Sequence, residues 1–341
     1  MSYEIRIEGA DVVFLADEDQ TLLDAAAKQG IEIPYSCRKG ACGNCKGRVV
    51  HGQLVPGTEG GGHEAGINSP DEHLFCRAKP ASNLLIAPRS WRRADPNARK
   101  TLTATVLRNQ LVARDVSILS LRFPAGVRAR FAAGQYLEVV APDGGRRAFS
   151  MANAPHESDG VQLHIRHMPG GDFTSGVVPG LVKGDVLQIE LPFGDFYLRE
   201  DSDRPILFIA GGTGFAPVKS IIDHMIKRDI HRPISLFWGA RDPSGLYAQQ
   251  MVERWIKQRP SLRYEPVISG PVDDSVWSGR RGRLPEAVLE AFESAKGFDV
   301  YACGASAMVQ AARIAVVEQL GLPEDRFFSD AFVCNSPSAK D

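Results

Sequence analysis

A dense group of cysteines constrains this chain more strongly than any other feature of its sequence. Three of its six cysteines, Cys37, Cys42 and Cys45, lie in the segment "YSCRKGACGNCKG", and Cys76 follows much later in "HLFCRA". The pattern C-x4-C-x2-C with a distant fourth cysteine is typical of plant-type [2Fe–2S] sites. Zinc sites more often pair their ligands as two C-x2-4-C units or use histidines. The spacing therefore favours an iron–sulfur site, with a zinc site or unrelated buried cysteines as the alternatives.

The residues between these cysteines are small. Gly40, Ala41, Gly43 and Gly47 all lie in or beside the loop. A backbone without large side chains can pass close to a bound group, and its N–H groups can then donate hydrogen bonds to sulfur. The composition of the loop thus agrees with the spacing of its cysteines.

Length and charge limit the class of protein. A chain of 341 residues predicts two or three domains. The net charge of −1 argues against nucleic acid as a partner, since phosphate binding requires a basic surplus. No segment has the roughly 20 apolar residues of a membrane helix. The N-terminus "MSYEIRIEGADVVF" alternates polar and apolar residues, which predicts a strand rather than a signal peptide, and hence a cytoplasmic protein.

The pattern of apolar residues predicts three domains. Residues 1–90 form a small domain with strands over 3–8, 11–16, 46–52 and 83–88 and one helix over 21–30. The basic segment "RSWRRADPNARK" predicts a linker, placed at residues 91–100. Residues 101–200 form the second domain, and residues 204–335 the third.

The second and third domains differ in the order of their elements. Six short strands between Gly and Pro turns predict an antiparallel β-barrel in the second domain, over 102–110, 116–123, 135–142, 146–152, 161–168 and 185–192. The third domain alternates strands and helices, which predicts an α/β doubly wound parallel sheet. Its strands are expected over 205–211, 234–240, 263–269 and 298–304, and its helices over 215–228, 246–258 and 305–320.

One barrel strand, "RRAFSMAN", carries a candidate binding motif. Arg147 can hold a phosphate, Phe149 can cover a ring, and the hydroxyl of Ser150 can hydrogen-bond to a ring nitrogen. The later segment "IRHMPGGDFTSG" adds Arg166 and a glycine turn before a short helix, where backbone N–H groups suit a phosphate. Without this second segment, an ordinary barrel strand explains the first equally well.

The third domain contains a second glycine-rich turn. "AGGTGFAP" joins an apolar strand to an amphipathic helix, which suits a pyrophosphate at the helix N-terminus, although such turns are common. "YACGASAM" places Cys303 and Gly304 at the end of another parallel strand, where such folds bind ligands. A buried cysteine that only packs is the alternative.

These motifs together resemble two known families. The first 90 residues resemble plant-type ferredoxins, through "PYSCRKGACGNC" and "LFCRA". The resemblance implies a β-grasp fold and a [2Fe–2S] cluster with Cys37, Cys42, Cys45 and Cys76 as its ligands.

The rest of the chain resembles the ferredoxin-NADP⁺ reductase superfamily, through R-A-F-S, G-D-F-T, G-G-T-G-x-A-P and Y-A-C-G. This resemblance implies a flavin in the barrel domain and a nicotinamide nucleotide in the third domain. The implied flavin-binding residues are Arg147, Phe149, Ser150, Asn153, Ile165, Arg166, Gly171, Phe173 and Thr174. The implied nucleotide-binding residues are Gly211, Gly212, Thr213, Gly214, Arg241, Cys303 and Gly304.

The same resemblance implies roles for particular side chains. Ser150 would hydrogen-bond to flavin N5, and Cys303 would lie beside the nicotinamide C4. In "FFSDAFV", Asp330 would replace the glutamate that is usual in the family and would act in catalysis together with Ser150 and Cys303. Phe332 in the same segment would cover the flavin ring. Cys334 has no assigned role. The segment "SMAN" favours FAD over FMN, and Arg241 without a second cation favours NADH over NADPH.

In domain order, nearly the whole chain resembles the reductase components of bacterial multicomponent aromatic-ring oxygenases, such as the terephthalate dioxygenase type. This implies electron transfer from NADH through FAD and [2Fe–2S] to a terminal oxygenase that hydroxylates or demethylates aromatic compounds. The chain is also similar to the CDP-6-deoxyhexose dehydratase reductases of deoxysugar biosynthesis, which gives the alternative function. A redox sensor and a free flavin or quinone reductase are the remaining alternatives.

Overall fold

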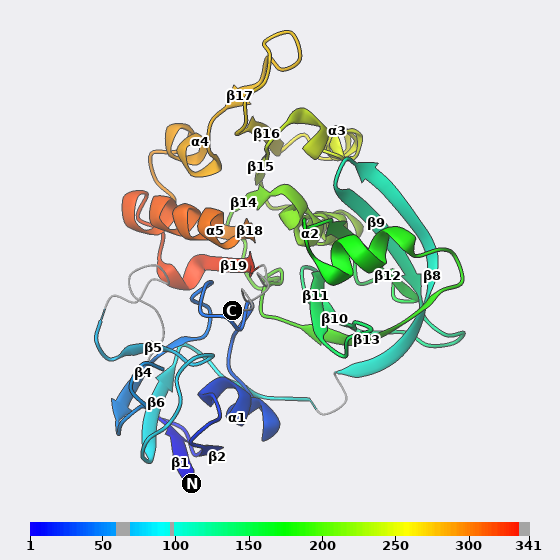
Figure 1. Cartoon of the computed structure of the whole chain (residues 1–341). Helices are drawn as coiled ribbons and strands as arrows, with labels where there is room; N and C mark the ends of the chain where they lie inside the picture. Colours follow the sequence, from blue (N-terminus) through cyan, green and yellow to red (C-terminus); the bar gives the residue numbers. More distant parts are fainter. Residues whose placement is uncertain (59–68, 96–98, 334–341) are drawn as a thin grey trace. The chain divides into compact units, whose positions relative to one another are not determined.

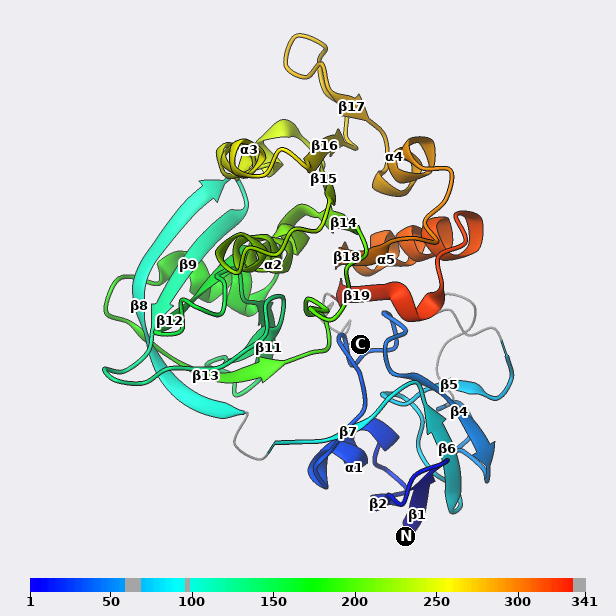
Figure 2. The same cartoon turned by 180° about the vertical axis from the view of Figure 1, so that it is seen from behind.

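A computed structural model describes residues 1–58, 69–95 and 99–333 of the chain. The chain divides into two compact units. The first comprises Met1–Ala98 together with Ser329–Asp341, and the second comprises Arg99–Phe328. Figure 1 and Figure 2 show the elements of each unit from two sides.

The first unit is built on a five-stranded sheet with the order β2–β1–β6–β4–β5. Its strands are β1 (Ser2–Ile7), β2 (Val13–Asp17), β4 (Lys46–His51), β5 (Glu72–Leu74) and β6 (Leu84–Pro88). Strand β1 pairs antiparallel with β2 and parallel with β6. Helix α1 (Leu22–Lys28) buries Leu22 and Leu23, and the Thr21 hydroxyl caps it by accepting from the Asp24 N–H. The mixed sheet with one helix is the arrangement that the β-grasp prediction requires.

Part of the segment predicted as a linker forms a strand. Strand β7 (Arg92–Arg93) pairs antiparallel with β3 (Ile31–Glu32), which follows helix α1. The Arg92 guanidinium lies 2.6 Å from the Glu32 carboxylate. A two-residue strand has too few positions to show any periodicity, so the sequence pattern could not reveal it.

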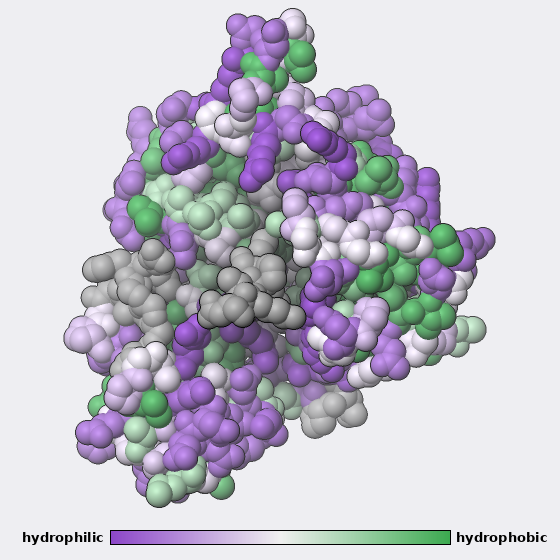
Figure 3. All heavy atoms as spheres, viewed as in Figure 1, coloured by the Kyte–Doolittle hydropathy of each residue, from purple (hydrophilic) through white to green (hydrophobic). Residues whose placement is uncertain are grey.

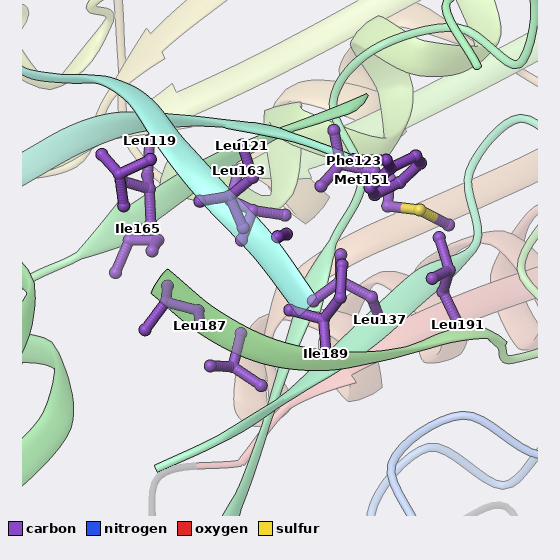
Figure 4. Close-up of a cluster of buried hydrophobic side chains, with 14 of the residues drawn as sticks. Leu119, Leu121, Phe123, Leu137, Met151, Leu163, Ile165, Leu187, Ile189 and Leu191 are labelled. Atoms are coloured by element: carbon purple, nitrogen blue, oxygen red, sulfur yellow. The ribbon is translucent and has the colours of Figure 1, made fainter. Parts of the chain in front are cut away.

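The second unit begins with a six-stranded antiparallel barrel. Its strands are β8 (Lys100–Ala113), β9 (Val116–Arg122), β10 (Tyr136–Val140), β11 (Arg146–Ser150), β12 (Gly160–Arg166) and β13 (Val186–Phe193), in the order β11–β10–β13–β8–β9–β12. A bridge between Met151 and Leu163 joins the two outer strands and closes the barrel. Figure 4 shows Leu119, Leu163 and Ile189 among the fully buried side chains that fill its interior. All six predicted barrel strands are present.

The second unit continues into a six-stranded sheet with the order β17–β16–β15–β14–β18–β19, in which the strands from β17 to β18 pair in parallel. The last strand, β19, runs past Phe328, so its residues from Ser329 on belong to the first unit. Its strands are β14 (Ile206–Gly211), β15 (Ile234–Ala240), β16 (Leu262–Ile268), β17 (Arg280–Arg281), β18 (Asp299–Ala305) and β19 (Phe327–Phe332). Helices α2 (Phe215–Lys227) and α3 (Gln249–Gln258) cover one face, and α4 (Leu284–Ala291) and α5 (Ser306–Arg313) cover the other (Figure 1). Helix α5 continues as a π-helix over Ile314–Gln319. The predicted doubly wound fold is confirmed, and α4 is an addition to it.

On the face shown in Figure 3, hydrophobic residues are interspersed among hydrophilic ones. Within the described ranges, no helix is both long enough and apolar enough to cross a membrane.

A cluster of aromatic side chains packs beside the start of α2. Phe215 stacks on Trp238 with ring centroids 4.0 Å apart, and Tyr247 contacts both rings edge-on. The Tyr247 hydroxyl lies 2.9 Å from Nδ1 of His164, which strand β12 contributes. Burial, with a smaller effect of the Lys219 charge, lowers the pKa of His164 to about 3. The imidazole is therefore neutral at pH 7 and forms part of the core.

We expect His164 to make the stability of the second unit depend on pH. The unfolded chain protonates this imidazole near its ordinary pKa of 6.5, whereas the folded chain resists protonation down to about pH 3. Stability is thus complete above pH 6.5 and falls as the pH is lowered. The loss is about 2 kcal/mol between about pH 7.5 and 5. Urea unfolding followed by tryptophan fluorescence at both pH values measures it.

His164→Gln should abolish this component of the pH dependence, whatever its effect on stability at pH 7.5. His156→Gln, which changes an exposed histidine of the same unit, is the matched control and should keep the wild-type dependence. An unchanged pH dependence in His164→Gln would contradict the assignment.

Candidate functional site

The structure brings the four cysteines of the predicted cluster together. Cys37, Cys42 and Cys45 lie on the loop between β3 and β4, and Cys76 follows β5. The thiols form two hydrogen-bonded pairs, Cys37 with Cys42 and Cys45 with Cys76. All but the half-buried Cys37 are buried.

Two pairs of thiols suit two irons better than one ion. A [2Fe–2S] cluster takes two of its four protein ligands on each iron, whereas a zinc ion draws all four around one centre. The arrangement of the donors therefore fits the cluster.

Backbone N–H groups surround the sulfur of Cys37. The N–H groups of Lys39, Ala41 and Cys42 donate to this Sγ over 3.3 to 3.4 Å. The hydrogen bond from the Cys42 thiol and these three donors lower the pKa of Cys37 to about 5. In the other pair, the hydrogen bond from Cys45 is the main cause that lowers the pKa of Cys76. One thiol of each pair, Cys37 and Cys76, thus favours the thiolate, the form that binds iron. The hydrogen bond to its partner and burial raise the pKa of the other thiol, Cys42 or Cys45.

The loop folds around this sulfur because three of its residues have positive φ. Gly40 and Gly43 have φ of 79° and 77°, and Arg38 has a φ of 54° although it carries a large side chain. The Arg38 guanidinium lies 3.0 Å from the Asp24 carboxylate and 4.4 Å from the centre of the Tyr35 ring. These contacts offset the cost of the left-handed backbone at this position.

Strand β11 carries the first part of the predicted flavin motif. Arg147 is half-buried and its guanidinium lies 2.8 Å from the carboxylate of Asp143. Phe149 packs near Phe173, with ring centroids 5.9 Å apart, and Ser150 is buried at the end of the strand. The structure therefore brings Phe173, which belongs to the predicted phosphate turn, beside the ring of Phe149 on β11.

The phosphate turn is held by its own side chains. The hydroxyl of Thr174 accepts from the Met168 N–H over 3.2 Å. A Cβ at Gly171 would lie only 2.6 Å from the same hydroxyl, so a glycine is needed there. The turn opens a six-residue π-helix, Asp172–Val177.

Two other predicted flavin residues use their side chains within the barrel. The Asn153 amide donates to the carbonyls of Glu157 and Gly160 and accepts from the Gln162 N–H. The side chain of Ile165 lies in the barrel core. Because these side chains are engaged within the barrel, any contact of Asn153 or Ile165 with a cofactor would involve mainly their backbone atoms.

The structure places Arg166 beside the glycine turn of the parallel sheet. An atom added as Cβ to Gly212 would lie 2.9 Å from an Arg166 guanidinium nitrogen. The same guanidinium lies 3.2 Å from the carboxylate of Asp115. The flavin and nucleotide motifs are therefore neighbours within the second unit.

The two nucleotide motifs are also in contact with each other. A Cβ at Gly214 would lie 2.1 Å from the carbonyl oxygen of Cys303, and one at Gly304 would lie 3.0 Å from that of Gly211. Gly304 has a φ of 147°, which a residue with a side chain rarely adopts. Thr213 and Cys303 are both buried at this contact. The glycines serve close packing of two backbones as well as any approach of a ligand.

Sequence reasoning missed the residue that supports this turn. The indole N–H of Trp238 donates to the carbonyl of Gly212 over 2.9 Å. Trp238 lies on β15, in a strand that reads as wholly apolar, so its sequence context shows only burial.

The remaining predicted residues lie at strand ends. Arg241 is exposed directly after β15. Asp330 is buried and Phe332 is half-buried on β19, and both belong to the first unit. Their roles at the nicotinamide and flavin stay predictions. Cys334 lies outside the described residues.

Comparison with protein families assigns each segment. Residues 5–81 match the 2Fe-2S iron-sulfur cluster binding domain, residues 103–197 the oxidoreductase FAD-binding domain, and residues 208–313 the oxidoreductase NAD-binding domain. The predicted fold class and the predicted [2Fe–2S], FAD and nicotinamide nucleotide cofactors are confirmed.

Full-length relatives have the same combination of domains. The chain is 44% identical over 336 residues to the reductase component 1 of terephthalate 1,2-dioxygenase from Comamonas sp., covering 97% of this chain and 98% of that protein. It is 36% identical over 333 residues to the CDP-6-deoxy-L-threo-D-glycero-4-hexulose-3-dehydrase reductase of Yersinia pseudotuberculosis, covering 98% and 99%. Among solved structures, the Amycolatopsis cytochrome P450 reductase superposes with a TM-score of 0.77 at 31% identity, covering 98% and 100%.

These similarities extend over the whole chain and agree with the geometry of its sites. The cysteine pairs lie in the iron–sulfur domain, and the contiguous glycine and arginine motifs lie in the FAD and NAD domains. The chain belongs to the family of NAD(P)H-dependent iron–sulfur flavoprotein reductases that serve as reductase components of multicomponent oxygenases and related systems.

Proposed function

We propose that this chain is the NADH-dependent reductase of a multicomponent system that hydroxylates or demethylates aromatic compounds, and that it passes electrons to the terminal oxygenase. The observation that carries the proposal is the 44% identity to a terephthalate dioxygenase reductase over nearly the full length of both chains. The second candidate, a reductase for a CDP-6-deoxyhexose dehydratase, is supported by a relative at 36% identity. The cytoplasm is the proposed compartment, because a set of reduced thiols persists there.

The cofactors divide the chemistry among the domains. When bound, FAD takes a hydride from NADH and the cluster takes single electrons, so the pair converts a two-electron donor into a one-electron supply. The chain's own residues hold and orient these groups. We assign Arg147, Arg166 and the turn at Gly171 to the flavin phosphates, with the Ser150 hydroxyl as a donor to the flavin ring.

The nucleotide site uses the contact between Gly214 and Cys303. Backbone N–H groups of the glycine turn would bind the pyrophosphate, and the buried Thr213 and Cys303 would flank the nicotinamide. Asp330 and Phe332 keep the roles that the family resemblance implies for them.

Asp242 supports NADH as the donor. This residue follows Arg241, which the family resemblance implies to lie near the adenine ribose. Its carboxylate accepts from the N–H groups of Ser244 and Gly245. The hydrogen bonds from Ser244 are the main cause that lowers the pKa of Asp242, so the group is anionic at pH 7. A fixed negative charge suits a ribose hydroxyl and repels a 2′-phosphate.

We expect kcat/KM for NADH to exceed that for NADPH by at least about tenfold, which is about 1.4 kcal/mol. Asp242→Asn keeps the acceptor oxygen and removes the charge. It should therefore lower the ratio of kcat/KM for NADH to kcat/KM for NADPH, mainly by raising kcat/KM for NADPH. Asp201→Asn, an exposed aspartate of the same unit, should leave the ratio unchanged. Steady-state rates with ferricyanide as acceptor give both constants. Equal use of the two nucleotides by the wild type would refute the assignment.

Cys76→Ser tests the route of the electrons. Loss of one ligand should remove the cluster and abolish NADH-dependent reduction of cytochrome c. Reduction of ferricyanide should persist, because this small acceptor takes electrons from the flavin directly. Absorption spectra of the purified variant check that flavin is retained. Reduction of cytochrome c that persists without the cluster would show that the electrons do not leave through it, and equal loss of both activities would contradict direct transfer from the flavin to ferricyanide.

Reconstitution with purified partners tests the acceptor. With NADH present, the chain should support turnover of an aromatic-ring dioxygenase oxygenase component at a rate at least about tenfold above that with a CDP-6-deoxyhexose dehydratase. Product formation by each partner is the measurement. The opposite order would favour the second candidate function.

A further inference from the structure

A residue from the far end of the chain is bonded to the cluster loop. Asn44, which lies between the ligands Cys42 and Cys45, donates through Nδ2 to the carbonyl of Ser329 over 2.7 Å. In return, the Ser329 hydroxyl donates to Oδ1 of Asn44 over 2.9 Å. The two residues are 285 positions apart and belong to the same compact unit.

Ser36 extends this pair into a closed network. Its hydroxyl donates to the Ser329 carbonyl over 2.9 Å and accepts from Nδ2 of Asn44 over 2.8 Å. The Ser329 hydroxyl also lies 3.3 Å from the carbonyl of Cys42. Both amide protons of Asn44 and its oxygen are therefore engaged, and every partner lies beside a cluster ligand or on Ser329.

The network is buried and so is costly to break. Ser329 is 0% exposed and Ser36 is 5% exposed. Removing one partner from a buried hydrogen bond leaves the other unsatisfied, which destabilises more than the bond itself contributes. In a buried network of this kind, the geometry of each member depends on the others.

The bonded positions bracket three of the four ligands. Ser36 directly precedes Cys37, the Cys42 carbonyl belongs to a ligand residue, and Asn44 directly precedes Cys45. Residues that do not bind the metal themselves, but hydrogen-bond to the residues that do, affect how tightly a metal group is held and what its reduction potential is.

We propose that Asn44 and Ser329 are positioning residues for the [2Fe–2S] ligands, so that the C-terminal segment of the first unit, which begins at Ser329, is part of the cluster-binding site. The proposal concerns the retention and potential of the cluster, and it holds for either candidate partner.

Ser329→Ala and Asn44→Ala in the full-length holoprotein test this proposal. Each variant should release its iron to an added chelator at least about fivefold faster than the wild type, measured by the absorbance of the iron–chelator complex. The midpoint potential of the cluster, from a dye-coupled titration followed by electron paramagnetic resonance, should also shift. A residue that only stabilises the fold would leave the potential of the remaining cluster unchanged.

Another hydroxyl and amide in the same unit provide the controls. The Ser82 hydroxyl accepts from the Gln53 N–H, and Oδ1 of Asn83 accepts from the Glu4 N–H. Both residues lie just before strand β6 rather than on the cysteine loop. Ser82→Ala and Asn83→Ala should keep the wild-type rate of iron release and the wild-type potential. Release from these controls as fast as from the test variants would overturn the proposal.

The double variant Asn44→Ala/Ser329→Ala measures the coupling of the two residues. Because they bond to each other, the double variant should release iron less rapidly than the product of the two single effects predicts. Where Ser329→Ala fails to fold, Asn44→Asp keeps the side-chain size, removes both amide donors and should still speed iron release.

The outcomes separate this inference from the proposed function. Wild-type rates and potentials in both test variants would overturn the positioning role and leave the electron route intact. A wild-type chain that holds no cluster would instead refute the proposed function itself.

Discussion

Supplying hydrogen-bond donors to the half-buried sulfur of Cys37 is the constraint on which the first unit depends. Three backbone N–H groups converge on the sulfur of Cys37. They can do so because Arg38, Gly40 and Gly43 have positive φ, which curls the loop around the thiol. A loop that is curled in this way cannot form regular secondary structure, so it needs support from the residues around it. That support comes from Asp24 on helix α1 and from the side-chain network of Ser36, Asn44 and Ser329.

In the second unit, the predicted nucleotide motifs are held in place by direct contacts between two backbone segments. Gly214 lies so close to the Cys303 carbonyl that no side chain fits, and Gly304 does the same against Gly211. The end of β14 and the end of β18 are thereby held together at the edge of the sheet where ligands bind in such folds. Trp238 supports the turn with a hydrogen bond to Gly212 and packs against Phe215. The glycine turn that we predict to bind the nucleotide is therefore supported by packed aromatic side chains.

Neutral buried groups connect the barrel to this cluster. His164 of β12 contacts Tyr247, and burial keeps the imidazole neutral by lowering its pKa while it raises the pKa of the tyrosine. Arg166, two residues further along β12, reaches the Gly212 turn. One barrel strand thus contributes both to the packing and to the charge of the region between the flavin and nucleotide motifs.

The sequence by itself determined the features whose physical cause is local. The period of apolar residues predicted all six barrel strands and the four main parallel strands, and the spacing of the cysteines predicted an iron–sulfur site. Short elements such as β7 were beyond this reasoning, because two residues show no period. Helix α4 also went unpredicted.

Only the tertiary structure decided which distant residues meet. Asn153 shows the difference, since nothing in the sequence indicates that its amide donates to the carbonyls of Glu157 and Gly160. Nothing local to Ser329 in "FFSDAFV" indicates that it bonds to a loop 285 residues away. Hydrogen bonds between such positions depend on how the whole chain is packed, and no pattern within a short window records that packing.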